Sequence, residues 1–95
     1  MQNDINCLVS VIIPTYKRPG MLGRAIESCL KQTYQNIEIL VIDDNNPDSE
    51  GRKETISFME KYSNNKKIRY IKRKKNGGGA ESRNEGIKES KGDYI

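Results

Sequence analysis

The chain has 95 residues, a formal net charge of +4 and no histidine. At this length it forms one small domain at most. The missing histidine excludes a histidine general base, a Ser/His triad and histidine metal ligands, and the positive charge favours an anionic partner of unspecified kind. The sequence also lacks a membrane-spanning apolar run, a signal peptide and a Cys-x-x-Cys motif, so we expect a cytoplasmic location.

The first half of the chain predicts two strands separated by a helix. Residues 8–13 form an almost continuous apolar, β-branched run, which predicts a strand covered on both faces and ended by Pro14. From Pro19, apolar residues recur at steps of three and four and predict an amphipathic helix that ends near Thr33. Residues 37–42 predict a second buried strand.

The second half continues the alternation. Apolar spacing predicts another helix that extends to Tyr62, with Asp48 or Ser49 as its N-cap. Residues 67–71 alternate in polarity and predict a third strand that is more exposed than the other two. Residues 80–90 predict a third, mostly polar helix.

Residues 93–95 look like the start of a fourth strand. Strands and helices therefore alternate from end to end, which is the pattern of an α/β layered fold with right-handed crossovers. We expect a three-layer, Rossmann-like α/β domain with a mostly parallel sheet over residues 1–95.

Two strand ends carry residues that suit a flat, phosphate-bearing ligand. In such sheets ligands gather beyond the carboxyl ends of the strands. Tyr16 and Arg18 follow the first strand, and Asp43 and Asp44 follow the second. A tyrosine can stack on a ring, a carboxylate can accept from a ring N–H or a ribose hydroxyl, and an arginine can bind phosphate. An ordinary turn whose acids cap loop amides explains the same residues, and both interpretations stay open.

Three other functions deserve comparison. Residues 66–75 include seven basic residues, which indicates either a nucleic-acid-binding α/β module or an edge strand protected by lysine charge. The glycine-rich residues 77–79 lack the third glycine of a dinucleotide fingerprint, which would fall at Ser82, and they follow the third strand instead of the first. A phosphate-accepting receiver domain would need its acidic pair after the first strand. A basic nucleic-acid-binding α/β module is therefore the alternative function.

Four stretches of this chain carry a family pattern: residues 9–18, 25–34, 38–45, and 80–87 followed by 92–95. In their order and spacing they resemble the N-terminal half of family 2 glycosyltransferases of the GT-A fold. The resemblance covers residues 8–95 and implies an enzyme that uses a nucleotide-sugar donor, most often a UDP-sugar. It implies transfer to a saccharide or another acceptor, as in polysaccharide biosynthesis, with residues 1–95 as the nucleotide-binding half.

The resemblance also implies nucleotide-binding roles for eight residues. The turn after the first strand would line and flank a uracil pocket, and the acids after the second strand would contact base or ribose. The glycine-rich stretch and the start of the third helix would approach ribose and diphosphate. In chain order these residues are Pro14, Thr15, Tyr16 and Arg18, then Asp43 and Asp44, then Gly78 and Arg83.

Family members bind Mg²⁺ or Mn²⁺ through an Asp-x-Asp motif that would follow residue 95. The resemblance therefore implies a metal-dependent enzyme whose metal ligands, acceptor site and general base lie outside this chain. We expect neither a catalytic residue nor transfer activity in these 95 residues alone. Asp43 and Asp44 alternate faces along an extended chain, so we do not expect them to form a metal site. The sheet order that the resemblance implies places the fourth strand beside the first, so a chain that stops at residue 95 would leave the first strand poorly covered. We therefore expect a homo-oligomer formed through that sheet edge.

Overall fold

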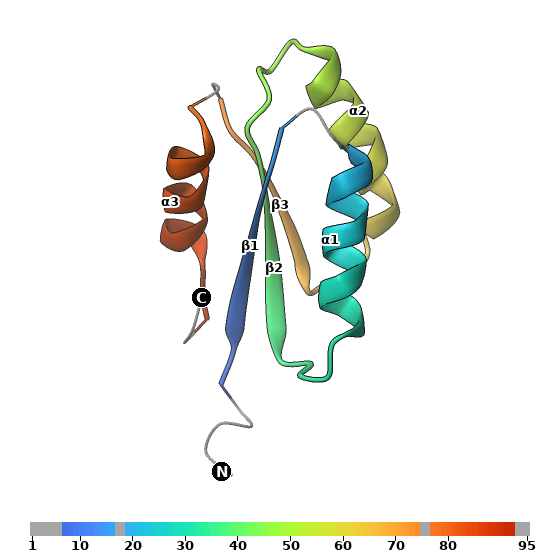
Figure 1. Cartoon of the computed structure of the whole chain (residues 1–95), viewed down its shortest axis with the longest axis vertical. Coiled ribbons are helices and arrows are strands. Elements are labelled where there is room, and N and C mark those ends of the chain that lie inside the picture. Colours follow the sequence, from blue (N-terminus) through green and yellow to red (C-terminus); the bar gives the residue numbers. More distant parts are fainter. Residues whose placement is uncertain (1–6, 17–18, 75–76, 93–95) are drawn as a thin grey trace.

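The computed structural model describes residues 7–16, 19–74 and 77–92, which form three layers (Figure 1). A parallel sheet in the order β1-β2-β3 lies in the middle, with two helices over one face and one over the other. This arrangement confirms the expected Rossmann-like α/β class. The elements are β1 (Val9–Thr15), α1 (Pro19–Lys31), β2 (Ile37–Asp43), α2 (Glu50–Met59), the 3-10 helix η2 (Glu60–Tyr62), β3 (Ile68–Lys72) and α3 (Gly79–Glu89).

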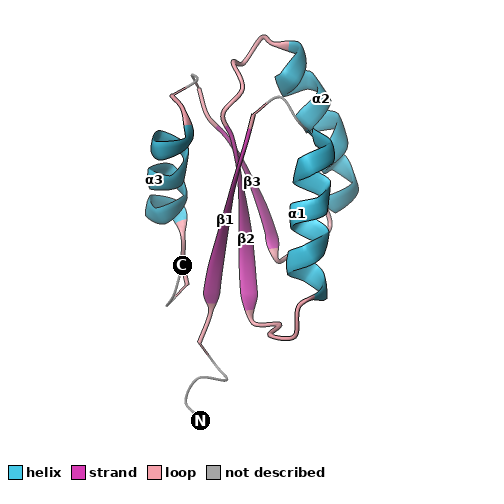
Figure 2. Ribbon diagram, in the orientation of Figure 1, coloured by secondary structure: helices cyan, strands magenta, loops and turns pink. Residues whose placement is uncertain are grey.

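The central strand β2 is buried along its whole length. Because side chains alternate across a strand, Ile37, Ile39 and Val41 face α1 and α2, where they form the main apolar core. Leu40 and Ile42 face the α3 layer and are also fully buried. Figure 2 shows β2 between its two neighbours, with α1 and α2 together on one side and α3 alone on the other.

The structure corrects two expectations for β1. The strand does not end at Pro14: it continues to Thr15, with Pro14 opposite Ile42 of β2. An edge strand tolerates proline because the missing N–H need not pair with a neighbour. Most of β1 is also only partly buried instead of covered on both faces. Within the described residues it pairs with β2 on one side, and association of copies through its other edge stays a prediction.

The remaining element ends follow local chemistry. Ser49 is the N-cap of α2, since its hydroxyl accepts a hydrogen bond from Arg52 N at 3.1 Å. The α1 helix ends at Lys31, two residues before the expected end at Thr33. All of β3 is partly or fully exposed, as expected. The expected fourth strand at residues 93–95 lies outside the described residues.

The α3 helix packs closely on β1 because it presents a glycine to the sheet. A Cβ atom added at Gly86 would lie 2.5 Å from Cγ2 of Ile12, well inside van der Waals contact. The absence of a side chain at this position therefore sets how closely α3 approaches the strand.

A polar cluster fastens the end of α3 to the amino end of the sheet. The buried Glu38 of β2 accepts hydrogen bonds from Ser10 Oγ and from the Lys91 backbone N, both at 2.5 Å. Arg69 of β3 lies 3.6 Å from the same carboxylate and donates to the Glu89 carbonyl at 2.7 Å. Burial raises the pKa of Glu38, but these hydrogen bonds and the arginine charge together bring it below its ordinary value.

None of the helices in the part of the chain that the structure describes has the length and apolar character needed to cross a membrane. A cytoplasmic location stays a prediction from the sequence.

We expect Gly86→Ala to destabilise the fold by about 1–3 kcal/mol, because the new methyl group forces α3 away from Ile12. The matched control is Gly20→Ala in α1, where a Cβ meets nothing within 4 Å among the described residues. Alanine favours a helix over glycine, so the control should be neutral or stabilising. Urea denaturation of both variants measures the difference, and equal stabilities would contradict this packing.

Glu38 should also make the fold acid-sensitive. Its lowered folded-state pKa gives stability that is present above the unfolded pKa near 4.5 and is lost as pH falls through the folded-state value. We expect Glu38→Gln to be less stable at pH 7 and to lose less stability on acidification than the wild type. Thermal melts between pH 7 and pH 3 test this, with the exposed Glu54→Gln as control. Parallel pH profiles for wild type and Glu38→Gln would refute it.

Candidate functional site

The two adjacent acids at the end of β2 face opposite layers of the molecule. Asp43 pairs with Arg52 of α2, whereas Asp44 pairs with Arg73, which follows β3, on the side of α3. The alternation of side chains along an extended backbone produces this divergence. The acids therefore have separate surroundings and separate roles.

Asp43 is fully buried, with 0% of its surface exposed. Its Oδ1 accepts from the backbone N and side-chain Nδ2 of Asn45 at 2.9 and 2.7 Å, and its Oδ2 accepts from the Tyr70 hydroxyl. Burial and then this hydrogen bond and charge raise the pKa of Tyr70 far above its ordinary value, so the phenol keeps its proton and stays a donor. Asp43 thus acts inside the protein, and its contact with a ligand stays a prediction.

Arg52 is a buried arginine, 6% exposed, in the first turn of α2. Its Nη2 donates to the carbonyls of Asn45 at 2.7 Å and Arg73 at 2.6 Å, with the Asp43 carbonyl at 3.3 Å. Its Nε lies 3.1 Å from Asp43 Oδ2, an ion pair in which the N–H is not aligned for a hydrogen bond. One guanidinium therefore joins the segments that leave β2 and β3.

Asp44 holds the glycine-rich segment that opens α3. Its Oδ1 accepts from Arg73 Nη1 and from the Gly77 amide, each at 3.0 Å, and its Oδ2 accepts from the Gly78 amide at 2.8 Å. The carboxylate is 4% exposed. Gly78 has φ of +89°, a left-handed conformation that side chains disfavour, so glycine suits this turn. The predicted acid and the predicted glycine are therefore in direct contact.

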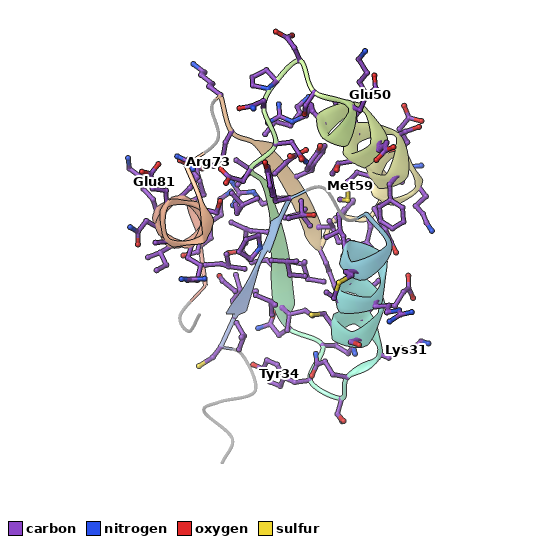
Figure 3. All side chains as sticks on the ribbon, turned by 45° about the horizontal axis from the view of Figure 1, so that its top comes forward. Lys31, Tyr34, Glu50, Met59, Arg73 and Glu81 are labelled. Atoms are coloured by element: carbon purple, nitrogen blue, oxygen red, sulfur yellow. The ribbon has the colours of Figure 1, made fainter. Side chains whose placement is uncertain are left out.

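Arg73 links this carboxylate to α3. Its Nη2 lies 3.2 Å from Glu81 Oε1 in the first turn of α3, and Figure 3 shows both side chains between the end of β3 and that helix. Partial burial lowers the pKa of Arg73, but its bonds to Glu81 and Asp44 raise it overall. Two carboxylates and one cation thus meet beside the amino end of α3.

The end of β1 lies beside this cluster. The Asp44 backbone N donates to the Thr15 carbonyl at 2.9 Å, which joins the first and second loops. Tyr16 follows immediately and is 45% exposed. With Pro14 and Thr15 it lines an open groove of about 260 Å³, whose other wall includes Met21 of α1. Tyr16 and the backbone of Asp44 therefore occupy the same edge of the sheet, and Tyr16 lines the exposed groove.

One of the predicted residues lies away from this cluster. Arg83 is exposed on α3 and lines a separate groove along residues 9–12 of β1. Arg18 lies outside the described residues. Their roles toward a nucleotide stay predictions.

Three residues at this edge were not predicted as site residues. Arg73 directly follows β3, so its position after a strand could have indicated it, but it was counted within a basic run. Arg52 and Tyr70 gave no such signal, because a helical arginine and a strand tyrosine are usually explained by solvent exposure and packing.

The residues at this edge do not suit a divalent cation. Asp43 and Asp44 face different layers, and each is already paired with an arginine. In the ranges that the structure describes, no three His, Cys, Asp or Glu side chains converge as metal ligands would. A hard cation needs several oxygen ligands around one point.

Three of the seven basic residues between 66 and 75 are engaged within the fold. Arg69 pairs with Glu38 and Glu89, and Arg73 pairs with Asp44 and Glu81. Lys67 Nζ donates to the carbonyl and the side chain of Gln35. These contacts support a structural role for the charge of these three residues.

A sequence model of the family described as "Glycosyl transferase family 2" matches residues 10–95. The chain belongs to glycosyltransferase family 2. In this glycosyltransferase chain, the loops that meet around Asp44 lie at the carboxyl edge of the sheet. This is the edge at which α/β proteins bind ligands.

Curated relatives agree with this assignment. The chain is 38% identical over 88 residues to glycosyltransferase GlyG of Streptococcus pneumoniae, covering 93% of this chain and 28% of the relative. It is 45% identical over 93 residues to an uncharacterized glycosyltransferase of Rickettsia felis, covering 97% of this chain and 14% of the relative. For the uncharacterized glycosyltransferase EpsJ of Bacillus subtilis the identity is 38% over 89 residues, covering 93% and 24%. The chain thus spans less than a third of the length of each.

The different surroundings of the two acids predict different effects on stability. We expect Asp43→Asn to lose about 3 kcal/mol, because it leaves Arg52 as a buried, unpaired charge. Asp44→Asn should lose about 1 kcal/mol, because an amide oxygen can still accept from a glycine N–H. Urea unfolding of the two isosteric variants measures both values. Equal losses would show that the acids do not have these separate roles.

Proposed function

We propose that this chain is the nucleotide-binding half of a glycosyltransferase that uses a nucleotide-sugar donor, with UDP as the nucleotide. The observation that carries the proposal is the hydrogen bond that joins the backbone of Asp44 to the residue before an exposed aromatic ring, at one edge of the sheet. Tyr16 is adjacent to Thr15, and the Thr15 carbonyl accepts the hydrogen bond of the Asp44 amide. Family membership supports the donor class, and the geometry supports a planar, hydrogen-bonding base.

In this proposal each loop contacts a different part of the donor. Tyr16 stacks on the base, and the groove formed by Pro14 and Thr15 holds its edge. Asp44 accepts a hydrogen bond from a ring N–H or a ribose hydroxyl. Asp44 also holds the Gly77 and Gly78 amides at the start of α3. A nucleotide that reaches this carboxylate therefore lies beside a helix N-terminus, whose dipole favours phosphate groups.

The proposal assigns the remaining chemistry to parts of the protein beyond these 95 residues. The relatives are more than three times as long as the region they share with this chain. We propose that the ligands for Mg²⁺ or Mn²⁺, the general base and the site for a saccharide or other acceptor belong to that additional length. No step of the transfer is assigned to Asp43 or Asp44.

A nucleic-acid-binding module is the second candidate, and it rests on the basic residues of β3 and the loop that follows. The engagement of Arg69 and Arg73 with buried carboxylates argues against it, since little of their charge is left to contact phosphates. Steep salt dependence of RNA or DNA binding would favour this candidate.

A nucleotide titration followed by NMR tests the proposed function. We expect weak binding of UDP, preferred over other nucleoside diphosphates and little changed by Mg²⁺, with shifts at residues 14–16, 44, 77 and 78. Tyr16→Ala should weaken binding about ten-fold through lost stacking, and Asp44→Ala should also weaken it.

The control for this titration is Asp48→Ala, an exposed acid in the turn before α2. It removes the same charge as Asp44→Ala and should leave UDP affinity unchanged. Equal affinity for all nucleotides, or equal losses in Asp44→Ala and Asp48→Ala, would contradict the proposal.

A further inference from the structure

We propose that Arg52 is a positioning residue for the nucleotide site, an inference that rests on the proposed function. Its guanidinium holds the segments after β2 and β3 together, so that Asp44, Arg73 and the glycine amides meet at one place. Arg52 itself is buried at the base of these loops and does not contact the ligand in this proposal.

The position of Arg52 relative to the sheet supports this role. The last described pair of the β2–β3 ladder is Asp43 with Lys72, followed by one hydrogen bond from Arg73 N to the Asp43 carbonyl at 2.9 Å. Beyond that point, backbone hydrogen bonds between the strands no longer set the distance between the segments that follow β2 and β3. Arg52 continues the connection, because its Nη2 donates to Asn45 O on one segment and to Arg73 O on the other.

The residues bound by Arg52 flank the residues of the site. Asp44 lies between Asp43 and Asn45, and both neighbours contact Arg52. The Arg73 backbone is held by Arg52, while the Arg73 side chain reaches the Asp44 carboxylate at 3.0 Å. A shift of either segment would therefore change the Asp44–Arg73 contact and the contacts of Asp44 with the glycine amides.

Stability alone does not account well for a buried guanidinium at this place. The cost of burying an ion pair often matches its Coulomb gain, and apolar replacements can be equally stable. Arg52, however, satisfies carbonyls of two different segments as well as a carboxylate. Lysine keeps the charge but is a single compact donor group, so it cannot reproduce the planar fork that contacts the carbonyls and Asp43 together. Arg52→Lys therefore keeps the positive charge but removes the guanidinium geometry that holds the two segments together.

The test compares Arg52→Lys and Arg52→Met with Tyr62→Phe. The control removes a partly buried hydrogen bond from Tyr62 to Glu27 of α1, away from the site edge. Amide hydrogen exchange is measured by NMR at temperatures that give each variant the same free energy of unfolding. UDP affinity is measured at a temperature where all are fully folded.

We expect the Gly77 and Gly78 amides to exchange about ten-fold faster in Arg52→Lys than in the control, because Asp44 no longer holds them in place. UDP affinity should fall about ten-fold in Arg52→Lys and stay at the wild-type value in Tyr62→Phe. Arg52→Met should show the same changes; if it does not fold, Arg52→Lys decides the result.

Exchange rates and affinity in Arg52→Lys that match those of the control would overturn the positioning role. If the wild-type chain binds no nucleotide, the proposed function fails. The exchange measurement still tests the positioning of the loops by Arg52, because it requires no ligand.

Discussion

The buried ion pair between Asp43 and Arg52 is the contact on which the carboxyl edge of this sheet depends. It neutralises a carboxylate that has no access to solvent and brings a guanidinium to the carbonyls of two neighbouring segments. Removing either partner would leave the other charge buried without compensation. The same pair leaves Asp44 on the opposite face, where it binds Arg73 and the start of α3.

The two faces of the sheet are held by different forces. On the α1 and α2 side, β2 contributes an apolar core, with Asp43 at its end. The α3 helix has little apolar surface, and β2 secures it through two carboxylates: Asp44 at its start and Glu38 just past its end. Gly86 allows close packing between these points. The proposed nucleotide site thus borders the layer that relies most on polar contacts, which are directional and therefore define where a helix terminus sits.

The chain belongs to glycosyltransferase family 2, and its structure gives different positions to residues that look equivalent in the sequence. The acid pair reads as one feature in the sequence, yet one member supports the fold and the other faces the loops. Arg73 belongs to a run of basic residues, yet it is part of an ion-pair cluster at the edge. These distinctions separate the residues that shape the carboxyl edge from those that are proposed to contact a donor.

Hydrophobic periodicity in the sequence was enough to determine the α/β class, the order of the elements and the sheet edge on which Tyr16 and Asp44 lie. Each of these depends on local spacing and on the rule for parallel strands. Only the tertiary structure decided three other features. These are the extension of β1 through Pro14, the burial of Arg52, and the hydrogen bonds from the Gly77 and Gly78 amides to Asp44. Each joins residues that are distant in sequence or depends on which strand lies at the edge. No local pattern reports that a helical arginine will lie beneath two loops, since its burial is set by partners on β2 and β3.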